Sequence, residues 1–404
     1  MSDRAGATST PRPKIPRTVW ALGFVSLFMD VSSEMIHALL PVFLTGVLGV
    51  SVAMVGLIDG VAESTASISK VFSGYLSDRF GRRKPFILFG YGLGALTKPL
   101  FALAGGPFLV LAARFADRIG KGMRGAPRDA LIADVTPPEI RGRAFGLRQA
   151  LDTVGAFVGP ALAIMCMALF ANDFRLVFWI AAIPAALAVL CVIVGVDEGK
   201  KGADALPSTR QSIRMVDLKR LSRAYWMVVA VGVVFTLARF SEAFLILKAS
   251  EEGLPLALTP LVLVAMNIVY MIGAFPAGVA SDRIPVKAML LAGVATLATA
   301  DLVLAFLPGL PGTFLGIALW GAHMALTQGL FAKLVAQHAP NDLRGSAFGV
   351  FNLLTGLALL IASVVAGLAW DAAGSQATFL IGAVWAVAAG VAATALMREF
   401  DPAP

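Results

Sequence analysis

Apolar residues fill long stretches of this chain, and short polar segments separate them. Twelve stretches are close to or longer than the roughly 20 residues that an α-helix needs to cross a bilayer core. Because a bilayer offers no water to backbone amides and carbonyls, we expect each stretch to be a helix. The twelve stretches lie near residues 19–46, 53–74, 85–104, 107–134, 144–170, 174–196, 224–248, 259–280, 287–307, 312–336, 345–369 and 376–397.

The composition agrees with a protein of the lipid bilayer. Of the 404 residues, 58% are hydrophobic and 14% are charged, with a mean hydropathy of +0.81. About a quarter of the residues are charged in a typical soluble domain. The first apolar stretch follows the tail 1–18 and is too long for the core of a signal peptide, so we expect it to remain as the first span.

Basic residues favour one set of loops. Most of the 33 Lys and Arg residues fall in the two tails and in the loops after the second, fourth, sixth, eighth and tenth spans. We assign only Arg175 and Lys248 to the opposite loops. Since basic loops stay in the cytoplasm, both termini are predicted to be cytoplasmic in a multi-pass protein of the inner membrane. The net charge of +8 then reflects topology, and we expect no nucleic-acid partner.

Two segments occur twice, at nearly the same separation. Segment 74–85 returns in weaker form at 278–287, about 204 positions later, and segment 137–146 returns at 340–349, 203 positions later. The chain is therefore expected to consist of two similar halves, which is the architecture of many secondary transporters. We divide it into a cytoplasmic tail 1–18, a six-helix bundle 19–196, a cytoplasmic linker 197–223, a second six-helix bundle 224–397 and a cytoplasmic tail 398–404.

Segment 74–83 fits the pattern Gly-x-Leu-(small)-Asp-(basic)-x-Gly-(basic)-(basic) at every defined position. With the twelve spans and the half-length repeat, it resembles the loop 2–3 motif of the major facilitator superfamily, and the resemblance covers nearly the whole chain. Segments 30–36 and 128–134 look like a prokaryotic branch of that family. The resemblance implies an all-α membrane fold of two pseudosymmetric six-helix bundles that work by alternating access.

In that family the loop 2–3 motif acts as a cytoplasmic latch that favours the outward-facing state. Glycine permits close helix approach and a tight turn, and aspartate accepts hydrogen bonds from helix N-termini or arginines. The alternative is that the basic residues only keep the loop in the cytoplasm. The residues assigned to this gating motif and its second copy are Gly74, Asp78, Arg79, Gly81, Arg82, Arg83, Asp282 and Arg283.

Ionisable residues inside the spans are the candidates for chemistry, because each costs roughly 2.5–3.5 kcal/mol at the bilayer centre. Asp30, Glu34 and His37 of the first span are four and three residues apart and share one helical face. Desolvation favours the protonated form of a carboxyl group, so we predict that these three residues couple transport to protons. The alternative is a structural ion pair with the fourth or fifth span.

The fourth span is densely charged for a membrane helix. Arg114 aligns with the arginine of the family motif Arg-x-x-Gln-Gly-x-Gly-x-Gly, but Asp117 and Arg118 replace the Gln and the following Gly. This departure favours the interpretation that the fourth span binds an anionic ligand. The alternative is that its charges form a network with acidic residues of the first and fifth spans. The predicted substrate cavity comprises Arg114, Asp117, Arg118, Lys121, Arg148, Asp152, Arg239, Glu242, Asn267, Tyr270 and His323.

Charges toward the outer ends of the spans are given a simpler interpretation. We expect Asp59 and Glu63 of the second span to line a wet vestibule or to form an ion pair at its rim. Lys98 and Asp301 occupy nearly equivalent positions in the two halves, and we expect both to reach the membrane interface.

The fifth span reads Gly146-x8-Gly155-x3-Gly159-Pro160 and resembles the antiporter motif of the superfamily, which is associated with exporters. Glycines four residues apart form a groove for a neighbouring helix, and the proline bends its own helix. The final glycine pair of the motif is replaced by 163–164, and such grooves also serve plain packing.

These observations predict a proton-coupled antiporter that exports a small molecule, either a drug or a metabolite. A proton symporter that imports an anionic metabolite or a metal chelate is the alternative. The sequence holds no Gly-x4-Gly-Lys-(Ser/Thr) phosphate loop and no compact catalytic constellation, so neither an ATP-driven pump nor an enzyme is expected. Unequal halves do not supply the residue rings of a channel. We expect a monomer without a cofactor or resident metal.

Overall fold

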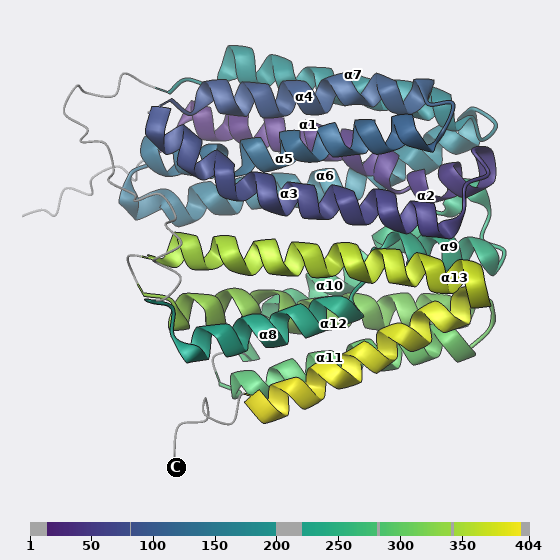
Figure 1. Cartoon of the computed structure of the whole chain (residues 1–404). Coiled ribbons are helices and arrows are strands. Elements are labelled where there is room, and N and C mark those ends of the chain that lie inside the picture. Colours follow the sequence, from purple (N-terminus) through teal and green to yellow (C-terminus); the bar gives the residue numbers. More distant parts are fainter. Residues whose placement is uncertain (1–13, 81, 199–219, 281–282, 341–342, 397–404) are drawn as a thin grey trace, which may run out of the picture.

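The computed structural model describes residues 14–80, 82–198, 220–280, 283–340 and 343–396. In these ranges every regular element is helical, and the long helices run side by side along one common direction (Figure 1). The long helices are α1 (Arg17–His37), α3 (Val52–Phe80), α4 (Lys84–Leu103), α5 (Pro107–Val135), α6 (Arg141–Leu169), α7 (Phe174–Gly195), α8 (Arg223–Ala238), α10 (Leu261–Ala280), α11 (Val286–Phe306), α12 (Gly309–His338) and α13 (Arg344–Leu396).

The predicted fold class is confirmed. Ten segments of the described chain are long and apolar enough to cross a membrane. Helix α5 is not among the ten because of its charges, and α13 contains two spans because the chain bends at Gly374. Gly374 has φ 81°, a left-handed conformation that glycine adopts without strain. The described residues therefore form twelve spans.

Helices α1 to α7 gather in one half of the molecule and α8 to α13 in the other (Figure 1). The packing repeats between the halves. Helix α5 packs against α3 and α4, and α12 packs in the same way against α10 and α11. This correspondence agrees with the repeat in the sequence. Most of the predicted linker 197–223 lies outside the described residues.

Two spans are interrupted at equivalent positions of the halves. After α1 ends at His37, the chain turns and continues as α2 (Leu40–Val42) and a π-helical turn (Phe43–Val47). After α8 ends at Ala238, residues 239–242 are not helical, and α9 (Ala243–Glu251) completes the span. The prediction of unbroken helices over 19–46 and 224–248 is wrong in this respect.

The two interruptions have different causes. In the first, Pro41 has no N–H to donate to the carbonyl oxygen of His37, four residues earlier, and its ring crowds that carbonyl group. The second contains neither proline nor glycine, and contacts with other helices stabilise it. The backbone N–H of Ser241 donates to Ser363 Oγ at 3.2 Å, and Ser241 Oγ donates to Asp59 Oδ2 at 2.8 Å.

The halves meet closely along α3 and α13. A Cβ atom added at Gly56 would lie 2.2 Å from the Ser363 carbonyl oxygen, so only glycine fits there. At one end of this contact the Asp371 carboxylate accepts hydrogen bonds from the backbone N–H groups of Val52 (3.0 Å) and Ala53 (2.9 Å). We call this end of the molecule the outer end, and the end that holds Lys14 and Leu396 the inner end.

Further contacts close the outer end. Helix α2 contacts α9, and α6 contacts the short helical turn η4 (Leu256–Leu258). Within the second half, Glu252 joins α9 to α12 at this end, because its carboxylate accepts from Lys248 Nζ at 2.6 Å and from the N–H of Gly309 at 2.7 Å. These two bonds lower the pKa of the Glu252 carboxyl group.

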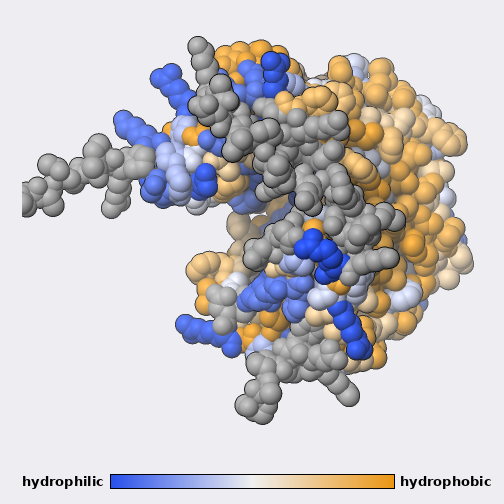
Figure 2. Space-filling model, turned by 60° about the vertical axis from the view of Figure 1, so that its left-hand side comes forward, coloured by the Kyte–Doolittle hydropathy of each residue, from blue (hydrophilic) through white to orange (hydrophobic). Residues whose placement is uncertain are grey.

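The inner end is open between the halves. Figure 2 turns this end forward and shows hydrophilic residues gathered around a hollow between the two lobes, whereas the flank of the molecule is apolar. Residues such as Val194 and Phe275, each 79% exposed, belong to this apolar surface and would face lipid. The molecule is thus closed at the outer end and open at the inner end.

Candidate transport site

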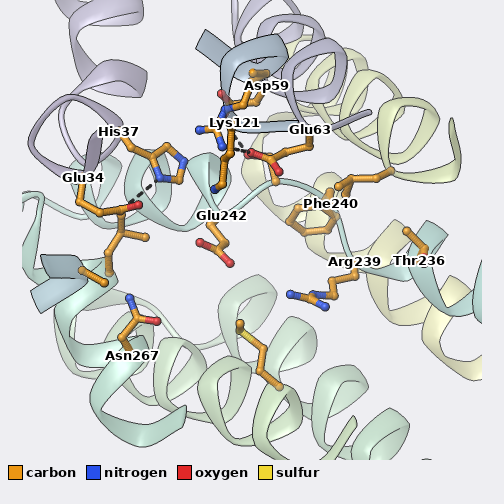
Figure 3. Close-up of a pocket in the computed structure, with 16 residues that line it drawn as sticks. Glu34, His37, Asp59, Glu63, Lys121, Thr236, Arg239, Phe240, Glu242 and Asn267 are labelled. Atoms are coloured by element: carbon orange, nitrogen blue, oxygen red, sulfur yellow. Dashed lines mark hydrogen bonds and ion pairs between the residues drawn. The ribbon is translucent and has the colours of Figure 1, made fainter. Parts of the chain in front are cut away.

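A cavity of about 450 Å³ lies between the two halves, next to the interruptions of both spans (Figure 3). Its size is in the range of pockets that hold a small organic molecule. The first half lines it with Glu34, His37, Asp59, Glu63, Arg118, Lys121 and Ala156. The second half lines it with Thr236, Arg239, Phe240, Ser241, Glu242, Leu263, Asn267, Met324 and Leu359.

The predicted proton-coupling residues lie on or beside this wall. Glu34 Oε2 is 3.5 Å from His37 Nδ1, and both side chains face the cavity. Asp30, one turn nearer the inner end, lies close enough to Asp152 of α6 for the charges of their carboxyl groups to interact. Arg148 in turn donates to Asp152. The first span thus places two separate carboxyl groups along one face.

Helix α6 reaches α1 because glycines occupy the contact. A Cβ atom at Gly155 would lie 3.0 Å from Asp30 Cβ, and one at Gly159 would lie 2.8 Å from Glu34 Cβ. The neighbouring Pro160 is buried inside α6. Gly146 has no neighbour within 4 Å of its ideal Cβ. Two glycines of the predicted motif therefore form the groove that receives the backbone of α1 beside its acidic residues.

Ion pairs with α3 neutralise two arginines of α5. Arg114 Nη2 lies 3.0 Å from Asp59 Oδ1, and Arg118 Nη1 lies 3.1 Å from Glu63 Oε1. Asp59 also accepts from Ser241 of the second half, so this pair touches both halves. Asp59 and Glu63 therefore belong to the cavity wall, and pairing with α3 accounts for two of the charges of α5.

Lys98 and Asp301 do not reach the membrane interface, so that prediction is wrong. Their side chains are buried, with exposures of 1% and 0%. Lys98 Nζ lies 2.9 Å from Asp117 Oδ1 and 3.0 Å from Ser33 Oγ, in a buried ion pair. Among the described residues neither carboxylate oxygen of Asp301 has a hydrogen-bond partner. The equivalent positions of the two halves have thus diverged in chemistry.

The structure brings some of the predicted cavity residues together and places others apart. Arg118, Lys121, Arg239, Glu242 and Asn267 line the cavity. Outside its lining are Arg114 and Asp117, which form the pairs described above; Arg148 and Asp152, which pair with each other; Tyr270; and His323, which is fully buried against Trp320 and Phe235.

Sequence reasoning missed the non-ionic part of the wall. Thr236, Phe240 and Ser241 flank or form the interruption between α8 and α9, where no sequence signal marked a change from helix. Met324 and Leu359 lie in spans whose apolar residues are too numerous to single out cavity positions. A search of the described residues finds no group of three or more His, Cys, Asp or Glu placed to hold a metal ion.

The gating motif is only partly described. Gly81 and Asp282 lie outside the described residues, as do the side chains of Asp78 and Arg79. Gly74 lies within α3, and Arg82 and Arg283 are exposed at the inner end.

Next to the motif, the inner ends of three helices are tied together. Arg83 Nε lies 3.6 Å from Asp134 Oδ2 of α5, and the backbone N–H groups of Arg83 and Lys84 donate to Glu198 after α7.

Comparison with known proteins agrees with this architecture. A sequence model of the Major Facilitator Superfamily matches residues 22–265 and 232–404. An uncharacterized MFS-type transporter of Methanocaldococcus jannaschii is 31% identical over 384 residues, which are 94% of each chain. The multidrug resistance protein MdtH of Proteus mirabilis is 32% identical over 161 residues, which are 40% of this chain and 37% of that one.

Two solved structures show the same fold at low sequence identity. A bacterial homolog of the human lysosomal transporter Spinster, inward-facing and unoccupied, superposes with a TM-score of 0.74 at 15% identity, covering 97% of this chain and 98% of that one. The peptide transporter POT in complex with sulfate gives a TM-score of 0.77 at 15% identity, covering 97% and 96%. Fold, repeat and sequence matches agree: the chain belongs to the major facilitator superfamily and is a multi-pass membrane transporter, not an enzyme.

Proposed function

We propose that this transporter exchanges protons for a small molecule and exports that molecule from the cell. The observation that carries the proposal is the face of α1, where Glu34 lines the cavity and Asp30 lies beside Gly155 of α6, near Asp152. Two carboxyl groups close together repel each other when both are ionised, and protonation of one removes the repulsion. A proton can therefore bind beside the cavity without leaving the protein interior.

Competition within one cavity gives the exchange. A cargo molecule that contacts Glu34 favours its ionised form, and a proton on the same wall weakens that contact. Closure of the outer end and opening of the inner end correspond to one of the two states that alternating access requires. The antiporter motif and the partial likeness to a multidrug resistance protein support export, and the loop charges support an inner-membrane location with cytoplasmic termini.

The test is proton movement driven by cargo in inside-out membrane vesicles. Respiration acidifies the lumen, acridine orange reports the gradient, and candidate compounds are added one at a time. An exporter of this kind releases lumenal protons as cargo enters, so the gradient collapses on addition of a transported compound. Asp30→Asn and Glu34→Gln each abolish this collapse, because neither variant can release the proton at its site.

Glu139→Gln is the matched control, because this exposed carboxylate at the inner end lies outside the cavity lining. Undiminished proton release in both α1 variants would refute the assignment. The unpaired cavity cations described below favour one competing function, proton symport of an anion. In the same vesicles a symporter would carry added cargo and protons inward together and would not collapse the gradient.

A further inference from the structure

Most charged groups of the cavity wall are already paired. Glu34 contacts His37, Asp59 contacts Arg114, and Arg118 contacts Glu63. These pairs satisfy the acidic groups of the first half with groups of the same half. A ligand therefore gains most from the charged groups of the wall that form no such pair.

Three charged side chains of the wall form no ion pair among the described residues. Lys121 of α5 is exposed to the cavity, and its ammonium group has no carboxylate within 4.0 Å. Arg239 and Glu242 flank the interruption between α8 and α9 and likewise have no partner at that distance. An unpaired charge in a partly buried site is costly unless water or a ligand compensates it.

The interruption explains why Arg239 and Glu242 do not pair with each other. On a continuous helix, side chains three positions apart are neighbours and opposite charges attract. Here the backbone leaves the helix at Arg239, and the two side chains both enter the cavity without meeting (Figure 3). The broken span therefore presents one cation and one anion to the same space.

The apolar part of the lining determines which chemistry the middle of the ligand needs. Phe240, Leu263, Met324 and Leu359 bring apolar surface from the second half. A ligand that fills this cavity needs an apolar body as well as charged groups.

We propose that the cargo is a small zwitterion with an apolar body. Its anionic group, a carboxylate, binds Lys121 of the first half and Arg239 of the second, and its amine binds Glu242. This inference rests on the proposed transport function of the cavity and specifies its substrate class. Contacts with both halves also let the ligand draw the halves together, which a ligand held by one half cannot do.

The test is binding to the full chain in lipid nanodiscs, read from the rise of the thermal unfolding midpoint with ligand concentration. The probes share one aromatic body: L-phenylalanine and L-alanyl-L-phenylalanine are zwitterions with two charge spacings, 3-phenylpropanoate is an anion, 2-phenylethylamine a cation and 3-phenylpropanamide neutral. We expect at least one zwitterion to bind about tenfold or more tightly than each other probe, because charge-assisted hydrogen bonds form at both ends.

Variants assign the two ends. Lys121→Ala and Arg239→Ala each weaken the zwitterion about tenfold and leave 2-phenylethylamine unchanged, whereas Glu242→Gln weakens the zwitterion and the amine. Removal of an unpaired charge leaves no partner behind, so folding is retained. Lys70→Ala and Arg223→Ala are matched controls, since both side chains are exposed and outside the cavity lining, and we expect them to bind all probes as the original chain does.

Equal binding of the neutral amide, a lack of response to every probe up to millimolar concentration, or unchanged zwitterion binding in all three cavity variants would overturn the proposal. The outcome is separable from that of the proton exchange. Zwitterion binding without proton release in vesicles refutes exchange and retains the ligand class. Proton release driven only by uncharged or singly charged compounds retains exchange and refutes the zwitterionic ligand class.

Discussion

Asp371 is expected to stabilise the state that is closed at the outer end. It lies on α13 in the second half, yet it caps α3 of the first half by accepting hydrogen bonds from the N–H groups of Val52 and Ala53. These groups separate when the outer ends of α3 and α13 move apart. Asp371→Ala therefore removes an interaction that only the inner-open state contains.

The structure sets the size of the effect. The N–H groups belong to the first turn of α3, where no intrahelical partner exists and a carboxylate gains from the helix dipole. Loss of such a cap costs about 0.5–2 kcal/mol, and the exposed position of Asp371 argues against a larger value. A change of about 1.4 kcal/mol shifts the equilibrium about tenfold toward the outer-open state.

Cysteine labelling measures this shift. Cys166 and Cys191 are replaced by alanine, and Thr236→Cys places one thiol on the cavity wall. A membrane-impermeant maleimide added to intact cells then reports how often the cavity opens outward. We expect Asp371→Ala to label about tenfold faster than the parent if labelling follows a fast opening equilibrium.

The chain supplies a matched control. Asp173 is also an exposed aspartate that caps a helix, but it caps α7 within one half, where its side chain accepts from the N–H of Leu176 at 3.1 Å. Asp173→Ala should lower stability by a similar amount without changing outward accessibility. Equal labelling rates for the parent and Asp371→Ala, or equal acceleration by both variants, would contradict the reasoning.

Two further predictions concern packing and buried charge. Lys98→Met should lower the free energy of unfolding in detergent by about 3 kcal/mol, because Asp117 loses its hydrogen-bonded partner and stays buried near Arg118, at 3.8 Å, and Arg124. Asp301→Asn should leave that free energy within about 1 kcal/mol, since its carboxylate has no hydrogen-bond partner in the described chain, and a loss as large as that of Lys98→Met would contradict this. Gly159→Ala should lower the free energy of unfolding by about 1–3 kcal/mol and reduce transport, because the new Cβ would lie 2.8 Å from Val31 O. Gly146→Ala is the control, because that position has open space around it, and it should retain both stability and transport. Equal losses in the two variants would show that the groove is not the cause.

The sequence predicts the global architecture because that architecture depends on averages over many residues. Twelve apolar stretches, loop charges and a repeat at one offset are each visible without knowledge of any contact. The ion pairs of α5 are different, since Arg114 pairs with Asp59, 55 positions away. Only the relative rotation and depth of α3 and α5 select that partner. From the sequence alone, the acidic residues of the first span were equally good candidate partners for Arg114, but in the structure they have other neighbours.

The second interruption could not be predicted for a similar reason. Residues 239–242 contain no helix breaker, and the conformation depends on Asp59 and Ser363 from other helices. The first interruption carries a local signal in Pro41, and the half-length repeat transfers it to the second half, because His37 and Phe240 are 203 positions apart. A repeat can therefore locate an irregularity that local propensity does not show.

The divergence of the halves bears directly on the proposed exchange. Position 98 is a lysine paired with Asp117, whereas the positions 203 residues later are Asp301, which lacks a hydrogen-bond partner in the described chain, and Trp320. The first half therefore contains a dense set of paired charges that holds α3, α4 and α5 together, and Lys98 also donates to Ser33 of α1. The second half surrounds its interruption with Phe240, Phe244 and Trp320. A buried charge pair is costly to break, whereas aromatic pairs remain favourable over a range of ring separations of about 4.5–7 Å. In the proposed exchange, the first half is thus suited to hold the proton site rigid, and the second half to adjust around the cargo when the outer end opens.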